Sequence, residues 1–157
     1  MAIVFSPEAE AEFQRLLPRY PTQRAATLPA LHLAQREFGW ISDEVTRYVA
    51  RRLELEPIQV HEVVTFYTMF HRKPVGKYVV ECCATLPCAL NGAEALLTHL
   101  EKRLGVKVGG TTPDGRFTLK KVECLAACGG GPCLQLNGTY HEQVTSAKAD
   151  QLLKELS

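Results

Sequence analysis

Six cysteines lie in one stretch of this 157-residue chain, between residues 82 and 133, and they constrain its fold more than any other feature. Four of them form two pairs, C-x4-C at Cys83 and Cys88 and C-x3-C at Cys124 and Cys128. The first residues lack the basic start and long apolar stretch of a signal peptide, so we expect a cytoplasmic chain with reduced thiols. The cysteines therefore predict a metal site rather than a set of disulfides.

The composition indicates a globular protein. Apolar residues make up 46% of the chain and charged residues 22%, which is typical of a folded domain rather than of a disordered segment. The formal net charge of +1 argues against nucleic acid as a partner. No apolar run approaches the roughly eighteen residues of a membrane helix, so we expect no direct insertion into a membrane.

The first half of the chain has helical periodicity. Ser6 and Ser42 are expected N-cap residues, Pro57 is expected to open a helix, and Gly39 is expected to end one. Pro29 should start or kink the helix that contains it. We therefore predict a small helical bundle, with helices over residues 7–17, 22–38, 43–52 and 57–67.

The pattern changes at residues 73–76, whose sequence Lys-Pro-Val-Gly favours a turn. We therefore predict an N-terminal helical domain at residues 1–73 and a second domain at 74–157. In the second domain, Asn137-Gly138 suits the type I′ turn of a β-hairpin. The expected elements are strands at 77–82, 117–122, 134–136 and 139–141, and helices at 92–104 and from residue 145 or 146 to 156.

This order, βαβ followed by ββα, predicts an α/β domain with a mixed four-stranded sheet flanked by helices, as in thioredoxin-like folds. Cys83 and Cys88 are expected in the loop after the first parallel strand, and Cys124 and Cys128 after the second. Loops at the carboxyl ends of neighbouring strands meet at one end of a sheet. The topology therefore predicts that the four thiols converge.

Four converging thiols suit more than one site. A [2Fe–2S] cluster needs four thiolates, two per iron. Structural zinc sites most often use C-x2-C, and thiol–disulfide exchange normally uses C-x-x-C, which this chain lacks. The spacing favours the cluster over zinc, with purely structural cysteines third. Residues 129–131, Gly-Gly-Gly, are expected to take unusual backbone angles and to let main-chain N–H groups approach sulfur.

The two remaining cysteines are expected not to be ligands. Alternation along a strand turns the side chains of Cys82 and Cys83 to opposite faces, so only one of them faces the site. The spacing to Cys88 favours Cys83, and Cys82 is then a core residue. Cys133 is the rival ligand, because Cys128-x4-Cys133 also has the spacing of a ligand pair.

The motifs resemble a known family. Residues 83–88 (CATLPC) and 122–128 (VECLAAC), with YPTQRAATLPALHLAQREFGWIS and VVTFYTMF in the helical half, are similar to the NuoE-type subunit of bacterial respiratory complex I. The resemblance covers almost the whole chain. It implies a thioredoxin-like [2Fe–2S] ferredoxin domain behind a small helical domain. It also implies one cluster held by Cys83 and Cys88 on one iron and by Cys124 and Cys128 on the other.

The resemblance also implies a function. A NuoE-type component of NADH:quinone oxidoreductase exchanges single electrons between its cluster and FMN on a NuoF-type flavoprotein. That flavoprotein oxidises NADH, and it links the NuoE-type component to the peripheral arm of the complex. The chain has no G-x-G-x-x-G motif and no P-loop, so we expect it to have no NADH or flavin site of its own. The expected place is the cytoplasmic side, peripheral to the inner membrane within a membrane-bound complex.

Other interpretations stay open. The same family includes the diaphorase-type subunits of NAD-reducing hydrogenases and NAD-dependent formate dehydrogenases, which the motifs do not separate. A free ferredoxin and a zinc-stabilised binding module without a redox role are remoter alternatives. The helical half is expected to dock on the flavoprotein, since a small carrier needs a fixed distance to its donor. No catalytic acid or base is expected in this chain.

Overall fold

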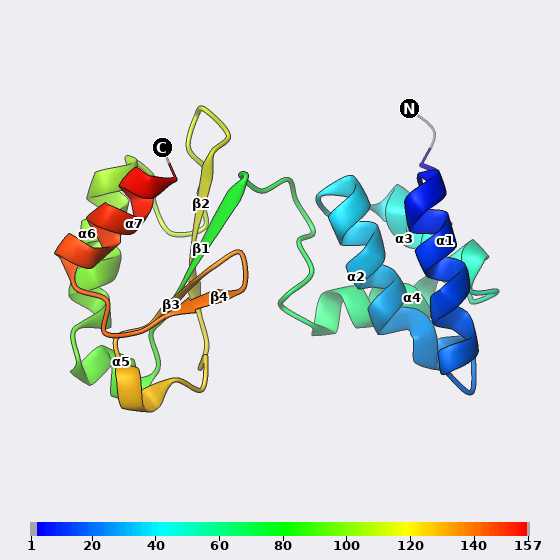
Figure 1. Ribbon diagram of the computed structural model, residues 1–157, viewed down its shortest axis with the longest axis horizontal. Helices are drawn as coiled ribbons and strands as arrows, with labels where there is room; N and C mark the ends of the chain where they lie inside the picture. Colours follow the sequence, from blue (N-terminus) through cyan, green and yellow to red (C-terminus); the bar gives the residue numbers. More distant parts are fainter. Residues whose placement is uncertain (1–2, 157) are drawn as a thin grey trace. The chain divides into compact units, whose positions relative to one another are not determined.

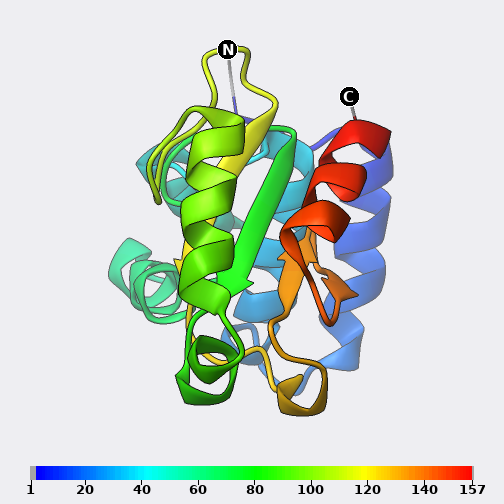
Figure 2. The same cartoon turned by 90° about the vertical axis from the view of Figure 1, so that its left-hand side faces the viewer.

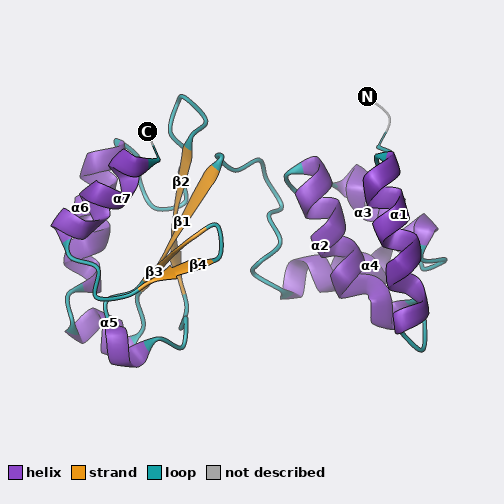
Figure 3. Ribbon diagram, in the orientation of Figure 1, coloured by secondary structure: helices purple, strands orange, loops and turns teal. Residues whose placement is uncertain are grey.

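The computed structural model describes residues 3–156. The chain separates into two compact units, Met1–Pro74 and Val75–Ser157. Helices build the first unit, and the second combines a sheet with helices (Figure 1, Figure 3). None of the helices within residues 3–156 has the length and apolar character that a membrane span requires.

The predicted helices of the first unit are confirmed. The hydroxyl of Ser6 accepts the N–H of Ala9 and that of Ser42 accepts the N–H of Val45, so both serines are N-caps. The second helix begins at Thr27, later than predicted, which places Pro29 in the first turn, where its missing N–H breaks no helical hydrogen bond. The helices are α1 (Pro7–Leu16), α2 (Thr27–Phe38), α3 (Asp43–Arg52) and α4 (Pro57–Phe66), with 3₁₀ turns at Leu17–Arg19 and Arg24–Ala26.

An ion pair on aromatic rings ties α1 to α3. The guanidinium of Arg52 donates to both carboxylate oxygens of Glu10, at 2.5 and 2.6 Å, and to the hydroxyl of Tyr48 at 3.0 Å. Its Cζ lies 4.5 Å from the ring centroid of the buried Phe13. Hydrogen bonds from Arg52, followed by one from Gln14, lower the pKa of Glu10 from 4.5 to about 2.

The second unit has the predicted mixed sheet, in the order β2-β1-β3-β4. β1 runs parallel to its neighbour β2, from Tyr78 opposite Phe117 to Cys83 opposite Val122, and β3 pairs antiparallel with both β1 and β4. The predicted α/β class is thereby confirmed. The elements are β1 (Tyr78–Cys83), α5 (Leu86–Leu90), α6 (Ala93–Leu104), β2 (Phe117–Val122), a 3₁₀ turn (Cys128–Gly130), β3 (Leu134–Leu136), β4 (Thr139–His141) and α7 (Ser146–Glu155).

Two helices cover one face of this sheet. Figure 2 shows α6 and α7 side by side in front of the strands. The leucines of these helices pack on buried residues of β2, β1 and β3, which are neighbours in the sheet. This contact buries apolar surface of both the helices and the strands. This core contains Val80, Cys82, Leu96, Leu97, Leu100, Phe117, Leu119, Leu134, Val144, Ala149 and Leu153.

The hairpin between β3 and β4 turns as predicted. Asn137 and Gly138 both have positive φ, 48° and 84°, as a type I′ turn requires. The side chain of Asn137 also accepts the N–H of Val79 at 2.8 Å and donates to the carbonyl of Lys77 at 3.0 Å. The turn residue therefore fastens the hairpin to the start of β1 and helps to set the position of β3.

Candidate metal centre

The end of β1 separates two adjacent cysteines. Cys82 is fully buried and packs with Val80 and Leu134 in the core under α6 and α7. Cys83 belongs to a different cluster of buried residues, with Cys88 and Cys133. The strand alternation expected for this pair is therefore present, and it places Cys83 at the carboxyl end of the sheet.

The segment after β1 differs from the loop that we predicted. Cys83 is the last residue of β1, and Cys88 lies inside a short helix, α5. This helix buries Cys88 but exposes Leu86 and Leu90, whose exposed fractions are 71% and 78%. The hydroxyl of its N-cap residue, Thr85, makes no capping hydrogen bond and instead lies 3.3 Å from the Sγ atom of Cys83.

Three buried thiols meet at this point. The Sγ atoms of Cys83, Cys88 and Cys133 all lie within 4.8 Å of one another, and those of Cys88 and Cys133 are 3.8 Å apart. The N–H of Cys83 donates to the carbonyl of Cys133 at 3.1 Å, so the contact of β1 with the segment before β3 holds the group together. Cys133, the rival ligand in the sequence, is thus a member of the cysteine group, but its neighbours there are Cys83 and Cys88.

The second predicted pair lies at the surface. Cys124 and Cys128 are exposed and follow β2. Ala126, between them, has a φ of +59°, and its N–H donates to the Sγ atom of Cys124 at 3.3 Å. A hydrogen bond with Cys124, and then the charge of that thiol, raises the pKa of Cys128.

The loop after β2 joins the two groups of thiols. The backbone N–H of Leu125 hydrogen-bonds to the thiol of Cys83, and Leu125 and Ala127 pack against the buried cysteines. The charges of Cys88 and Cys83 also contribute to the raised pKa of Cys128. All four predicted site cysteines therefore follow the carboxyl ends of β1 and β2, but the group of thiols within 4.8 Å of one another contains only Cys83 and Cys88 of the four, together with Cys133.

The surroundings give the buried thiols different acidities. Burial raises the pKa of Cys83, but hydrogen bonds with the hydroxyl and N–H of Thr85 and with the N–H of Leu125 outweigh it and bring the pKa to about 7. Burial raises the pKa of both Cys133 and Cys82 to about 12. Cys83 accordingly supplies a thiolate to a metal more readily than Cys133 or Cys82 does.

The triple glycine acts through close packing rather than through unusual backbone angles. None of residues 129–131 has a positive φ. A Cβ on Gly130 would lie 2.7 Å from the Cβ of Glu142, so the turn after Cys128 packs directly on the segment after β4. A Cβ on Gly131 would come 3.5 Å from the Sγ atom of Cys88, an ordinary contact distance. The backbone at Gly131 therefore passes close to Cys88.

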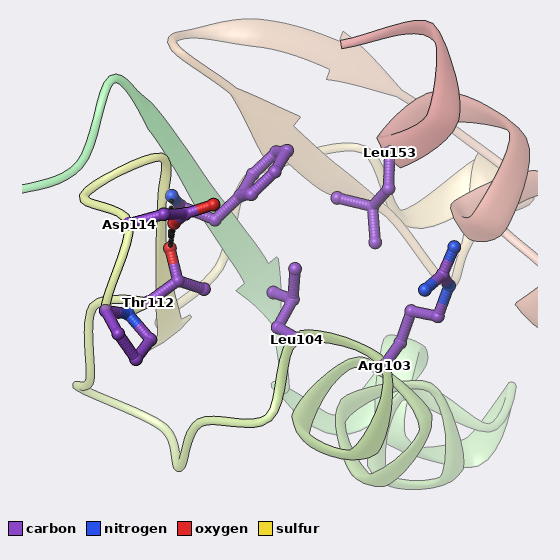
Figure 4. Close-up of a pocket in the computed structure, with 7 residues that line it drawn as sticks. Arg103, Leu104, Thr112, Asp114 and Leu153 are labelled. Carbon is purple, nitrogen blue, oxygen red and sulfur yellow. Dashed lines mark hydrogen bonds between the residues drawn. The ribbon is translucent and has the colours of Figure 1, made fainter. Parts of the chain in front are cut away.

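A separate pocket lies at the other end of the sheet. It has a volume of about 360 Å³ and is lined by Phe117 at the amino end of β2, whereas Cys83 lies opposite Val122 at the carboxyl end (Figure 4). Two of its polar side chains have partners. Arg103 contacts Asp150 at 3.2 Å, and the hydroxyl of Thr112 hydrogen-bonds to Asp114. This pocket is not part of the cysteine site.

The cysteine site fits a [2Fe–2S] cluster by its donor set and its surroundings. Two buried thiols, at the end of β1 and in α5, and two exposed thiols, in the loop after β2, lie at one end of the sheet. The N–H groups of Leu125 and Ala126 and the hydroxyl of Thr85 already face sulfur atoms, and such groups offset the negative charge of cluster thiolates.

Comparison with known proteins agrees with this site. The family profile of thioredoxin-like [2Fe–2S] ferredoxins matches residues 13–157. The chain belongs to this family. The match includes most of the helical unit as well as the sheet, so the family resemblance predicted from the motifs is confirmed for nearly the whole chain.

Several relatives of this ferredoxin-family chain come from NADH-quinone oxidoreductases or an NADH dehydrogenase. The NADH-quinone oxidoreductase E-type subunit 2 of Rhizobium meliloti (strain 1021) is 46% identical over 143 residues, which are 91% of this chain and 85% of the relative. The NADH-quinone oxidoreductase E-type subunit of Rickettsia felis is 43% identical over 145 residues, 90% of this chain and 87% of the relative. NADH dehydrogenase [ubiquinone] flavoprotein 2, mitochondrial, of Dictyostelium discoideum is 39% identical over 97% of this chain and 63% of its own length.

A solved structure has a similar fold. The air-oxidized NAD⁺-reducing [NiFe]-hydrogenase matches 83% of this chain with a TM-score of 0.73, at 22% sequence identity and over 22% of the hydrogenase chain. At this identity the likeness establishes only the fold of the ferredoxin-family chain.

Proposed function

We propose that this chain is the NuoE-type electron carrier of an NADH:quinone oxidoreductase. The observation that carries the proposal is the convergence of four cysteines at one end of the sheet in a chain 46% identical to the E-type relative from Rhizobium meliloti. A bound [2Fe–2S] cluster supplies one-electron exchange. The chain itself then holds the cluster and shields one side of it from water, and it needs no acid or base.

The proposed ligands are the four predicted cysteines. Cys83 and Cys88 would bind one iron from the buried side, and Cys124 and Cys128 would bind the other from the exposed loop. Because Cys124 and Cys128 are exposed, an iron that they held would lie nearer the surface, where an electron could enter or leave.

The proposed partner is a NuoF-type flavoprotein that carries FMN and the NADH site. In support, α5 exposes Leu86 and Leu90 directly beside the buried Cys88. In the helical unit, Ile58 and Phe66 of α4 are also exposed, by 62% and 77%. Apolar side chains on a surface favour a protein contact, and one beside the cluster would shorten the path of the electron. We propose that both surfaces contact the flavoprotein.

The cluster is tested by analysis of the anaerobically purified full-length chain. We expect about two iron atoms and two acid-labile sulfides per chain, and an electron paramagnetic resonance signal after one-electron reduction. Zinc without acid-labile sulfide, in a chain that also takes up no iron and sulfide once the zinc has been removed, would exclude the proposal and favour the zinc-stabilised module instead.

The partner is tested by purification of a tagged chain from cells that make the whole complex. We expect a flavoprotein and quinone-reductase subunits to copurify, whereas hydrogenase or formate dehydrogenase subunits would identify a different parent complex. Changing both Leu86 and Leu90 to Ser should abolish copurification while iron and sulfide content is retained. Val108→Ser alters an exposed apolar residue outside α5 and serves as the control.

A further inference from the structure

The buried cysteines have the geometry of a site for a single metal ion. In tetrahedral zinc sites the Zn–S distance is about 2.3 Å, which places two thiolates of one ion about 3.8 Å apart. The Sγ atoms of Cys88 and Cys133 are 3.8 Å apart, and that of Cys83 lies within 4.8 Å of both. The spacing of Cys88 and Cys133 matches that of two ligands of one ion, and Cys83 lies within about 1 Å of that spacing from both.

The three cysteines come from three separate parts of the second unit. Cys83 ends β1, Cys88 lies in α5, and Cys133 directly precedes β3. All three are at most 2% exposed, and Ala93, at the start of α6, packs among them. Because β1 and β3 pair in the sheet, the scaffold holds these thiols in place without contributions from Cys124 or Cys128. Soft thiolates in an apolar shell favour zinc over magnesium or calcium.

We propose that Cys83, Cys88 and Cys133 form a mononuclear site for Zn²⁺ in the chain that has no iron–sulfur cluster. Each of the three thiols releases its proton to solvent as its sulfur binds the ion, and a water molecule fills the fourth position. The hydroxyl of Thr85, 3.3 Å from the Sγ atom of Cys83, is placed to offset the excess negative charge.

The site has a consequence for cluster assembly. Zinc would occupy Cys83 and Cys88, which are also proposed cluster ligands, so that one chain holds either zinc or the cluster. This competition rests on the proposed function, whereas the zinc site itself does not. Cys133 distinguishes the two sites, since it belongs to the zinc site alone, and Cys124 and Cys128 belong to the cluster site alone.

The experiment titrates the reduced, cluster-free, full-length chain with Zn²⁺ against a chromophoric chelator under anaerobic conditions. We expect one Zn²⁺ per chain, and at least about 100-fold weaker binding for Cys133→Ala, because one of three protein ligands is lost. Cys82→Ala is the matched control, since Cys82 is equally buried but lies on the other face of β1. It should bind zinc within about threefold of the unchanged chain, as should Cys124→Ala.

Spectra and cluster loading complete the test. Co²⁺ in place of Zn²⁺ should give a thiolate charge-transfer band that Cys133→Ala weakens and Cys124→Ala retains. Cys133→Val fills the same space without a sulfur, and it should behave as Cys133→Ala, which separates a ligand from a packing role. Equal zinc affinity in the unchanged chain and both Cys133 variants would overturn the proposal, as would a loss of zinc binding in Cys124→Ala as large as that in Cys133→Ala.

Iron and sulfide reconstitution separates this inference from the proposed function. Cys133→Ala should load the cluster normally, and zinc added beforehand should block loading in the unchanged chain far more than in this variant. A chain that binds zinc through Cys133 but never loads a cluster would refute the proposed function and leave the zinc site standing. A chain that loads the cluster but binds zinc independently of Cys133 would refute the zinc site and leave the proposed function standing.

Discussion

Cys82 and Cys83 are adjacent in β1, yet their thiols lie in two different clusters of buried residues. Cys82 packs among the aliphatic side chains of the sheet, α6 and α7, and Cys83 faces Cys88 and Cys133. Both residues of this strand are almost completely buried, so burial does not distinguish a structural cysteine from a site cysteine here. The face of the strand on which each side chain lies distinguishes them.

This relationship predicts opposite effects for two otherwise similar substitutions. Cys83→Ala should abolish cluster binding, because it removes a proposed ligand. Cys82→Ala should retain iron and sulfide but lower the free energy of unfolding by about 1 kcal/mol, because it leaves a small cavity in the core. Metal analysis and urea unfolding of the two variants check this. Cluster loss in Cys82→Ala with retention in Cys83→Ala would show that the two assignments are exchanged.

The exposed cysteines make a different prediction. Cys124→Ala and Cys128→Ala should each lose the cluster, yet the cluster-free chain should unfold within about 0.5 kcal/mol of the unchanged one, because neither side chain is buried in the core. The measurement is iron content together with denaturant unfolding of the cluster-free chain. Full cluster content in both variants would remove these two residues from the ligand set.

Gly130 and Gly129 provide a matched pair in the turn after Cys128. Gly130→Ala should lower the free energy of unfolding by about 1–3 kcal/mol, because the new Cβ meets the Cβ of Glu142, which is not the flexible end of that side chain. Gly129→Ala places its Cβ where no atom lies within 4 Å, so it should be nearly neutral. Thermal unfolding of the two variants makes the comparison, and equal midpoints would contradict the close packing.

The ion pair of Glu10 and Arg52 predicts a pH dependence in the helical unit. The pKa of Glu10 is lowered to about 2 in the folded chain, so its contribution to stability is fully present above about pH 4.5 and is lost as the pH falls through 2. Because both side chains are partly exposed, the contribution should be at most about 1 kcal/mol.

Glu10→Gln provides the control for this effect. The difference in unfolding free energy between the unchanged chain and Glu10→Gln should be constant from pH 7 to pH 5 and should shrink between pH 4.5 and pH 2. Urea unfolding over this range measures it. A difference that grows on acidification would mean that the carboxylate destabilises the folded chain.

Local signals in the sequence were sufficient for most of the fold. Serine caps, Pro57, Gly39 and Asn137-Gly138 act on their immediate neighbours, and the structure has helix ends and a hairpin at these places. The alternation of Cys82 and Cys83 is also a local property of a strand. These features follow from the sequence because backbone geometry within a few residues decides them.

The composition of the cysteine site depended on contacts between distant residues. In the sequence, Cys133 suggests a pair with Cys128, which is five positions away. In the folded chain, Cys133 contacts Cys88, which is 45 positions away, because β3 pairs with β1. Likewise, Thr85 faces Cys83 instead of capping α5, and the two predicted pairs differ in burial. The sequence by itself determined the strands, the helices other than α5, and the two cysteine pairs. Strand pairing and packing decided which thiols are buried together, because those contacts exist only after distant segments meet.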